Sequence, residues 1–478
     1  MADREIRVAL AGLGTVGAAV IRLLQEEETR YREEIGVPLR LTLILDRSYQ
    51  RKDISWIGPA VRFTDSVEEF LETPADIVVE LLGGADPADR IITTGLQQCK
   101  AVVTANKLLL AKSIRRYFQL ALEHQSYLGF EAAVAGGIPI LRVLRRALFA
   151  DRIIRLRGIL NGTCNFILSE MADSGRDFQD VLGQAQALGY AEADPGLDIS
   201  GRDTADKLAI LSWLAFGKSL DPEHIPTLGI SMISPVDLIY ARRLDCAIRL
   251  LGVAERTGDA VSLRVSPFFV SQRLPLSAVS GVLNAVEVVG PRLGSTVFSG
   301  RGAGGDPTAV SVVADILNAA LWRQGQAPFY LQPFFHRREP PVWENGRMGE
   351  WESGKTRMGE WESGRVGDET NQLPFAHSPI PPFSSPPTPP LSQEVYPFYT
   401  RFFVKDRPGI IAAVASNLAR HEININSVWQ EPWSDHANLP FVMTVEPTLF
   451  STMQTAIVEL SQLDFNRVPP LALPILDR

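Results

Sequence analysis

The N-terminal part of the chain alternates short apolar runs with amphipathic stretches. Helix-like sequence separates the apolar runs, and its first stretch predicts a helix from Ala18 to about Glu34. Strands that alternate with helices predict a parallel sheet with right-handed crossovers. We therefore expect an α/β domain over residues 1–136. The apolar runs are IRVALA at 6–11, LRLTLIL just before Asp46, ADIVVELLGG at 75–84 and KAVVTANK at 100–107.

The pattern changes from about residue 137, where strands and helices no longer alternate regularly. This mixture predicts an α+β domain over residues 137–305. Segment 305–323 is a strong helix candidate that we expect to return to the first domain, which would be completed by about 306–330. The expected helices are 139–149, 177–188 and 201–216, and the expected strands are 153–159, 261–272 and 282–289.

Residues 337–395 have the composition of a linker. The octapeptide RMGEWESG occurs at 347–354 and again at 357–364, and a proline-rich run follows. Such sequence buries too little apolar surface to offset the entropy of ordering, so we expect disorder or polyproline II segments. After the linker, residues 396–475 read as a βαββαβ unit, which is the ferredoxin-like arrangement.

Composition narrows the class of protein. A formal charge of −8 argues against nucleic-acid binding, which usually needs a basic face. The three cysteines, Cys99, Cys164 and Cys246, form no CxxC pair, so we expect a reducing compartment. The start of the chain does not read as a signal peptide, and no apolar run is long enough to span a bilayer. We therefore expect a cytoplasmic protein that binds no membrane.

A glycine-rich motif follows the first predicted strand and opens a helix. The motif is Gly12-Leu13-Gly14-Thr15-Val16-Gly17. This GxGxxG context predicts a dinucleotide site, with the pyrophosphate at the helix N-terminus. At the end of the second strand, Asp46 favours the ribose hydroxyl of NAD, whereas Arg47 favours the 2′-phosphate of NADP. The two neighbours point in opposite directions, so the cofactor is left as NAD or NADP.

Further motifs carry candidate chemistry. Lys107 ends TANK, where ligands bind beyond the carboxyl edge of a parallel sheet. The bend EAAVAGGIP (131–139) has carbonyls that could bind a hard cation, or it is purely structural. In NGTCN (161–165), a helix cap with a small buried Cys164 is favoured over a nucleophilic thiol, because no histidine is near in sequence.

Segment 189–211, GYAEADPGLDISGRDTADKLAIL, is the most informative. Ser200 and Asp203 fit a capping box, and Asp203 and Lys207 lie one turn apart on one helix face. Carboxylates can bind a substrate ammonium group, and a lysine can donate a proton to a carbonyl oxygen that receives hydride. The alternative is an ordinary surface salt bridge, worth about 0.3–0.5 kcal/mol. A last motif, GRGAGGDPT (300–308), is either a second phosphate-facing turn or a tight connection.

Taken together, the motifs resemble those of the homoserine dehydrogenases. GLGTVG, ELLGG, TANK, EAAVAGGIP, NGTCN, the GYAEADP…GRDTADK block and GRGAGGDPTA occur in the family's order, and the match covers roughly 1–330 and 396–475. The resemblance implies a Rossmann domain, a catalytic and dimerisation domain, and a C-terminal ACT domain. It implies NAD(P)-dependent interconversion of L-aspartate 4-semialdehyde and L-homoserine, in threonine, methionine and isoleucine biosynthesis, with NADP slightly favoured.

The resemblance also assigns residues. Lys207 matches the acid/base lysine, and Lys107 matches a lysine that contacts cofactor and substrate. Glu192 and Asp203 match substrate-binding carboxylates, with Asp198 as a weaker companion. The cofactor residues are Gly12, Gly14, Thr15, Val16, Gly17, Arg47, Lys107 and Gly302. The family's monovalent cation site, for an ion such as sodium, falls on Glu131, Val134, Gly136 and Ile138.

The terminal segment resembles an ACT domain through Asp406-Arg407-Pro408-Gly409 and Asn424-Ile425-Asn426. An amino-acid effector, threonine, and a homodimer or homotetramer are thereby implied, although a long flexible linker would transmit little strain between the domains. There are two alternatives to this family. One is another ACT-containing dehydrogenase of amino-acid metabolism, and the other is a catalytically inactive amino-acid sensor on a Rossmann scaffold. The chain retains Lys107, Glu192, Asp203 and Lys207, a full set that an inactive sensor would not need.

Overall fold

The computed structural model describes residues 5–218, 220–326, 394–430 and 439–477. The expected linker at 337–395 therefore lies, except for its last two residues, outside the described part. None of the helices in the described residues combines the length and apolar content that a bilayer-spanning helix requires.

The N-terminal domain is a six-stranded parallel sheet in the order β3-β2-β1-β4-β5-β6. Its topology is that of a Rossmann domain, with the switch point between β1 and β4. The strands are β1 (Ile6–Ala11), β2 (Leu39–Leu45), β3 (Arg62–Thr64), β4 (Ile77–Glu80), β5 (Ala101–Thr104) and β6 (Leu128–Gly129). The helices are α1 (Thr15–Glu26), α2 (Glu28–Ile35), α3 (Val67–Glu72), α4 (Ala88–Gln97) and α5 (Lys107–Glu123).

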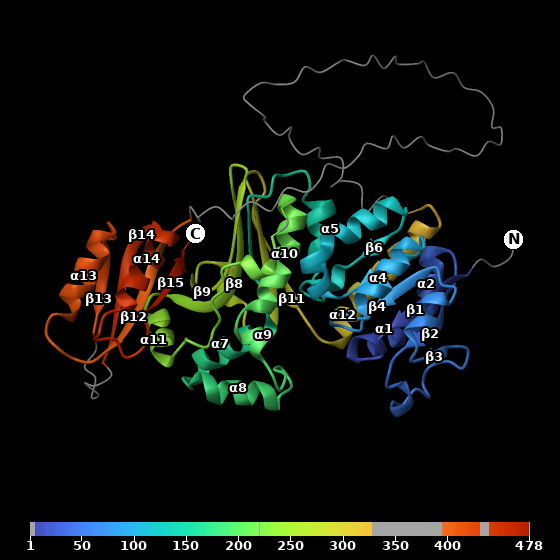
Figure 1. The fold of residues 1–478 in the computed structure, drawn as a ribbon, viewed down its shortest axis with the longest axis horizontal. Helices are drawn as coiled ribbons and strands as arrows, with labels where there is room; N and C mark the ends of the chain where they lie inside the picture. Colours follow the sequence, from blue (N-terminus) through green and yellow to red (C-terminus); the bar gives the residue numbers. More distant parts are fainter. Residues whose placement is uncertain (1–4, 219, 327–393, 431–438, 478) are drawn as a thin grey trace, which may run out of the picture. The chain divides into compact units, whose positions relative to one another are not determined.

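Helix α12 (Gly305–Arg323) completes this domain, as the sequence predicted. It contacts α1, and its apolar residues Val312 and Ile316 belong to the same core as Val8 and Leu10 of β1. In Figure 1 the ochre α12 lies among the blue and cyan elements of the N-terminal domain. One expectation was wrong: the helix from Ala18 to Glu34 is two helices, which meet at the non-helical Glu27.

The α+β domain after residue 137 contributes five antiparallel strands to a second sheet. Its strands are β7 (Arg155–Ile159), β8 (Cys246–Thr257), β9 (Ala260–Ser271), β10 (Leu283–Gly290) and β11 (Gly294–Arg301). Its helices are α6 (Ile140–Arg142), which continues into a π-helical turn (Val143–Ala147), α7 (Gly162–Ser174), α8 (Phe178–Ala187), α9 (Gly196–Ile199), α10 (Arg202–Phe216) and α11 (Pro235–Arg243).

The C-terminal unit has the expected βαββαβ order. It consists of β12 (Val395–Val404), α13 (Ile410–Arg420), β13 (Ile425–Trp429), β14 (Leu439–Leu449), α14 (Phe450–Ser461) and β15 (Leu471–Leu476). Strand β15 pairs in parallel with β9, so one nine-stranded sheet runs through the α+β domain and the C-terminal unit. The strand order is β11-β10-β7-β8-β9-β15-β12-β14-β13. The two parts are thus joined directly, and not only through the linker.

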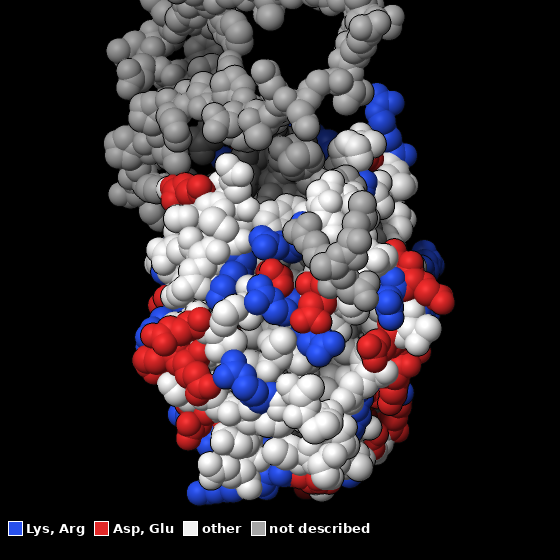
Figure 2. Space-filling model, turned by 90° about the vertical axis from the view of Figure 1, so that its right-hand side faces the viewer, with Lys and Arg blue, Asp and Glu red and all other residues white. Residues whose placement is uncertain are grey.

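Acidic and basic side chains are interspersed on the face drawn in Figure 2, which is the right-hand side of Figure 1.

Candidate active site

The turn between β1 and α1 has the space that a dinucleotide requires. A Cβ atom on Gly12, whose φ is +107°, would lie 2.6 Å from the Leu81 carbonyl oxygen, and one on Gly17 would lie 2.0 Å from the Gly12 carbonyl oxygen. A Cβ on Gly14 would meet nothing within 4 Å. Helix α1 begins at Thr15 and Val16 without a side-chain cap, so its first N–H groups are available to a phosphate. The residues present therefore fit the pyrophosphate of NAD(P).

Asp46, at the end of β2, is occupied by protein contacts. Its carboxylate accepts hydrogen bonds from Leu13 N at 3.0 Å, from Lys52 Nζ at 2.7 Å and from the backbone and hydroxyl of Ser48. Burial acts to raise the pKa of Asp46, but these hydrogen bonds outweigh it and lower the pKa to about 2. Arg47, by contrast, is exposed.

The centre of the site is a carboxylate shared by two lysines from different domains. Lys107, the first residue of α5 at the carboxyl edge of β5, donates to Oδ1 of Asp203 on α10. Lys207, one turn further along α10, donates to Oδ2 of Asp203 at 2.7 Å. The predicted alignment of Asp203 and Lys207 on one face of α10 is confirmed, and the contact with Lys107 brings the edge of the Rossmann sheet to α10.

Electrostatics hold this cluster in its charged form. Burial would raise the pKa of Asp203, but the ammonium groups of Lys207 and Lys107 outweigh it and hold the pKa far below its ordinary range. Burial would lower the pKa of Lys107, but Asp203 outweighs that effect and raises it. Lys207 also donates to the Leu160 carbonyl oxygen at 2.7 Å, so its Nζ is fixed from two sides.

The expected capping box at the start of α10 is wrong. The residue before the helix is Gly201, with a left-handed φ of +84°, and Ser200 instead bonds to the Leu197 carbonyl within α9. The tight turn between α9 and α10 requires a residue that tolerates positive φ, which Gly does and Ser does not. The turn still places Asp203 in the first turn of α10.

Two of the other carboxylates behave differently. Asp198, in α9, accepts a hydrogen bond from Asn161 Nδ2 at 2.8 Å, and the same nitrogen lies 2.9 Å from Oδ2 of Asp203. Asp198 is thereby brought to the cluster. Glu192 is exposed in the loop before α9, where its carbonyl accepts from Gln186. The structure therefore brings Lys107, Lys207, Asp203 and Asp198 together and leaves Glu192 at the surface.

Sequence reasoning missed two groups near the cluster. Asp206, on α10, has its pKa raised to about 6 by burial and by the neighbouring Asp203. The side-chain amide of Asn161 was interpreted only as a helix cap, although it also contacts two carboxylates. The NGTCN motif was the signal for Asn161, but the contacts span 37 and 42 residues of sequence and are invisible in local spacing.

Cys164 is not an activated nucleophile. It is buried in the first turn of α7, and its Sγ lies 3.1 Å from the Asp198 carbonyl oxygen. Burial and the nearby carboxylates of Asp198 and Asp203 raise the pKa of the thiol well above its ordinary value. A thiolate is therefore disfavoured, in agreement with the interpretation of Cys164 as a small buried residue.

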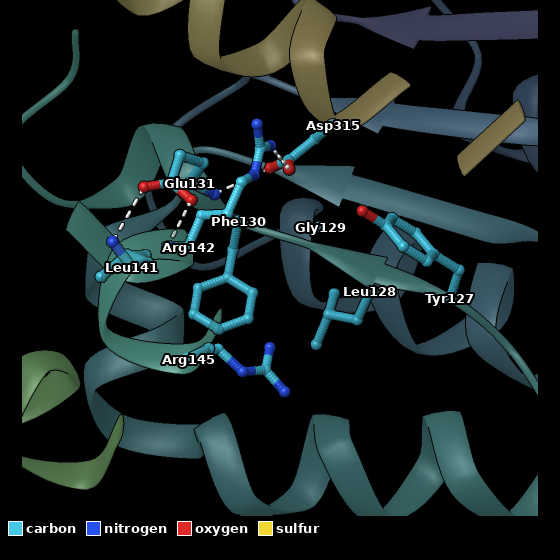
Figure 3. A pocket seen from close by; sticks show the side chains of 9 residues that line it. All are labelled: Tyr127, Leu128, Gly129, Phe130, Glu131, Leu141, Arg142, Arg145 and Asp315. Carbon is cyan, nitrogen blue, oxygen red and sulfur yellow. Dashed lines mark hydrogen bonds and ion pairs between the residues drawn. The ribbon is translucent and has the colours of Figure 1, made fainter. Parts of the chain in front are cut away.

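The bend at 131–142 is fixed by buried charges (Figure 3). The Glu131 carboxylate accepts from the backbone nitrogens of Leu141 and Arg142 at 2.8 and 2.9 Å, and Asp315 of α12 accepts from Glu131 N at 2.8 Å. Arg142 pairs with Asp315 at 3.1 Å. Burial and mutual repulsion raise the pKa of Glu131 to about 7, and burial raises that of Asp315 to about 6. These contacts tie the bend to α12.

The predicted cation residues lie in this buried bend and fit an ion only in part. The Gly136 carbonyl oxygen accepts from the Ser311 hydroxyl at 2.6 Å, and the Ile138 carbonyl accepts from Ile140 N at 2.7 Å. Val134 is buried nearby. Gly302 packs against the bend and against Asn284, whose Cγ would lie 2.0 Å from an added Cβ. Two of the predicted ligand carbonyls, those of Gly136 and Ile138, therefore already accept a hydrogen bond from the protein.

A dehydrogenase that uses a nicotinamide must hold a dinucleotide beside a group that can protonate the product oxygen. Here the glycine-rich turn and Lys107 lie at the same edge of the Rossmann sheet. Lys107 and Lys207 both contact the carboxylate of Asp203. The fold and the site define the class as an NAD(P)-dependent oxidoreductase.

Comparison with known proteins narrows this class. The model of the family "Homoserine dehydrogenase" matches residues 139–317, and that of "Homoserine dehydrogenase, NAD binding domain" matches residues 12–131. A homoserine dehydrogenase from Neisseria gonorrhoeae is 34% identical over 469 residues, which cover 98% of this chain and 97% of that protein.

Comparison with solved structures points to the same family. A homoserine dehydrogenase from Thiobacillus denitrificans has a TM-score of 0.82 at 33% identity, with 99% of both chains covered. A hyperthermophilic archaeal homoserine dehydrogenase in complex with NADPH has a TM-score of 0.58 at 28% identity, covering 67% of this chain and 98% of that one. The chain belongs to the homoserine dehydrogenase family and is an oxidoreductase that acts on a CH–OH group.

Proposed function

We propose that the Lys107–Asp203–Lys207 cluster interconverts L-aspartate 4-semialdehyde and L-homoserine at the edge of the Rossmann sheet. The observation that carries this proposal is the convergence of two lysines, 100 residues apart in number, on one buried carboxylate. When bound, the reduced nicotinamide supplies the hydride that reduces the aldehyde carbon. Every other part of the reaction is assigned to side chains of this chain.

Lys207 is the proton donor in this proposal. As hydride reaches the carbonyl carbon, negative charge develops on the oxygen, and the Lys207 ammonium gives it a proton to complete the hydroxyl group. In the reverse direction neutral Lys207 takes that proton back. Asp203 and the Leu160 carbonyl fix Lys207 Nζ, which reduces the reorganisation needed at the moment of reaction.

The carboxylates bind the amino-acid part of the substrate. Asp198 and Asp203 both accept a hydrogen bond from Asn161 Nδ2 and present negative charge to an ammonium group. Glu192, exposed in the loop before α9, would join them when that loop contacts the substrate. Lys107, with a side chain that is 43% exposed, lies between this cluster and the cofactor edge and would contact both substrate and cofactor.

We propose NADP as the preferred cofactor. Asp46 is engaged by Leu13, Ser48 and Lys52, so it is poorly placed to select the ribose hydroxyl of NAD. The exposed Arg47 and the Lys52 ammonium leave this end of the site basic, which suits a 2′-phosphate.

The C-terminal βαββαβ unit is, in this proposal, an ACT domain that binds threonine. Supporting it is a cavity of about 340 Å³ whose lining includes Asp406, Arg407, Pro408 and Gly409 of the recognised motif. Gly409 precedes α13, whose uncapped N-terminus suits a carboxylate.

We further propose a homodimer or homotetramer, for which the outer strand β11 offers a partly exposed edge.

The test is the oxidation of NADPH, and separately of NADH, by purified protein supplied with aspartate semialdehyde. We expect rapid oxidation, faster with NADPH, and inhibition on adding threonine. Absence of oxidation with either cofactor would reject the proposed reaction and favour an amino-acid sensor. Turnover that threonine does not affect, with no heat of threonine binding, would reject the effector alone. Sedimentation of the same sample gives the oligomer size.

A further inference from the structure

We propose that Asn161 is a positioning residue of the active site, whose side-chain amide sets the places of Asp198 and Asp203. This inference rests on the proposed function of the Lys107–Asp203–Lys207 cluster. It concerns a residue to which neither the family resemblance nor the helix-capping interpretation gives a part in the reaction.

Both the oxygen and the nitrogen of the Asn161 side-chain amide form hydrogen bonds. Its Oδ1 accepts a hydrogen bond from the backbone nitrogen of Cys164 at 2.8 Å, which caps α7. Its Nδ2 donates to Asp198 Oδ1 at 2.8 Å and to Asp203 Oδ2 at 2.9 Å. An amide nitrogen carries two hydrogens, so each carboxylate receives one. The side chain is 5% exposed, and the backbone N–H of Cys164 fixes which end of the amide faces the carboxylates.

The two hydrogen bonds from Asn161 Nδ2 offset the repulsion between the carboxylates of Asp198 and Asp203. Asp198 and Asp203 contact the same nitrogen, and two carboxylates held this close repel each other when both carry a charge. A neutral donor that bonds to both holds them together and adds no positive charge beyond that of Lys107 and Lys207, which already contact Asp203. A lysine or arginine in this position would bring a further cation to the carboxylates that are proposed to bind the substrate ammonium group.

Asn161 also acts together with its neighbour in the chain. Leu160, at the end of β7, accepts from Lys207 through its carbonyl, while Asn161 donates to the Asp203 oxygen that Lys207 also contacts. Two consecutive residues thus fix the proton donor and its carboxylate partner from the side opposite Lys107. Displacing Asp203 would move Lys207 Nζ, and displacements of about 1 Å in such sites can cost about 100-fold in rate.

Two variants separate positioning from capping. Serine caps helices about as well as asparagine but is too short to bridge two carboxylates, whereas alanine does neither. For both Asn161→Ser and Asn161→Ala we expect kcat/KM for homoserine to fall by ~100-fold or more. The KM for NADP should stay unchanged, and the acid limb of the pH profile should move to higher pH because Asp203 loses a donor. Only Asn161→Ala should lose thermal stability.

Asp177→Ala is the matched control, since Asp177 caps the neighbouring helix α8 through the Asp180 nitrogen at 3.0 Å and is exposed at the surface. It should lower the melting temperature by a few degrees and leave kcat/KM unchanged. If Asn161→Ser shows wild-type kcat/KM and an unshifted pH profile, Asn161 is only a cap and the inference is overturned. Absence of turnover in the wild-type protein would instead overturn the proposed function on which the inference rests.

Discussion

Asp203 shows how one residue can organise a site. It is buried, yet its carboxylate stays charged because two ammonium groups and one amide face it. An unpaired carboxylate in that position would be protonated or would destabilise the fold. The substrate ammonium group would therefore meet a negative charge that the protein has already stabilised.

The carboxyl group of Asp206 makes the stability of the folded protein depend on pH. Burial and the repulsion from Asp203 raise its pKa from the ordinary 3.8 to about 6 in the folded protein. Between these two values the folded form binds more protons than the unfolded form, so stability is lost as pH rises through about 4 to 6. Above that range Asp206 is a destabilising charge.

We therefore expect Asp206→Asn to be more stable than wild type at pH 8, by ~1 kcal/mol because solvent screens this partly exposed group, and equally stable at pH 4. Urea denaturation at a series of pH values measures the difference. Asp259→Asn, in the exposed β8–β9 turn, is the control and should show no such pH-dependent gain. A pH-independent difference for Asp206→Asn would contradict the assigned shift.

Arg47 tests cofactor choice. If it pairs with the 2′-phosphate, Arg47→Ala should raise the KM for NADPH by ~10-fold and leave that for NADH nearly unchanged, since a lost charge-assisted hydrogen bond is worth about 1.5 kcal/mol. Steady-state kinetics with each cofactor give the two values. Arg40→Ala, an exposed arginine paired with Glu5 elsewhere on β2, should change neither. Equal losses with both cofactors would remove Arg47 from phosphate recognition.

At the scale of elements, the turn between α9 and α10 determines where Asp203 lies. Gly201 has a φ of +84°, and a Cβ there would lie 2.9 Å from Thr227 Cγ2 and 3.1 Å from Val265 Cγ1. Gly229 packs closely against the Ile199 carbonyl, just before this turn, and so restricts movement of the start of α10. The catalytic helix therefore has little freedom to shift.

For Gly201→Ala we expect a loss of stability larger than the ~1 kcal/mol of the left-handed conformation alone, together with a several-fold rise in the KM for homoserine. Melting curves and steady-state kinetics report the two effects. Gly36→Ala is the matched control, because Gly36 has a φ of +77° but nothing within 4 Å of its added Cβ. If the two variants behave alike, contact with Thr227 and Val265 has no part in placing α10.

Sequence reasoning succeeded where local patterns decide the structure. Helix α12 was predicted with its bounds because apolar residues repeat helically after a Gly-Gly start. Strand β8 was missed because it is buried along most of its length and reads as a nearly continuous apolar run without alternation. The contact between Lys107 and Asp203 spans 96 residues, so only the family resemblance, and no spacing rule, placed the two in one site.

For the whole molecule, the C-terminal unit is attached through a buried polar contact as well as through the β9–β15 pairing. Arg401 of β12 pairs with Asp237 of α11 at 2.6 Å, and Tyr399 donates to the other oxygen of Asp237 at 2.8 Å. Arg401 also donates to the Met232 carbonyl at 3.1 Å. The expectation that a long flexible linker transmits little strain between the domains therefore leaves out these direct contacts.

Removing one partner of this buried pair should be costly. We expect Arg401→Met to lower the free energy of unfolding by ~3 kcal/mol, because Asp237 would be left buried without its cation. Chemical denaturation measures the loss. Arg420→Met, which breaks the exposed pair with Glu459 in the same unit, should cost far less, because solvent screens that pair. Similar losses for the two variants would show that the Arg401 contact does not fasten the C-terminal unit.

The measurement that tests the central claim most directly is turnover and NADPH binding by Lys207→Ala. The account predicts that kcat falls by ~1,000-fold in both directions while the dissociation constant for NADPH, from fluorescence titration, stays at the wild-type value. Lys112→Ala, which removes an exposed lysine paired with Glu223, should keep full activity. Near-normal turnover by Lys207→Ala would show that another group donates the proton, and the proposed mechanism would be wrong.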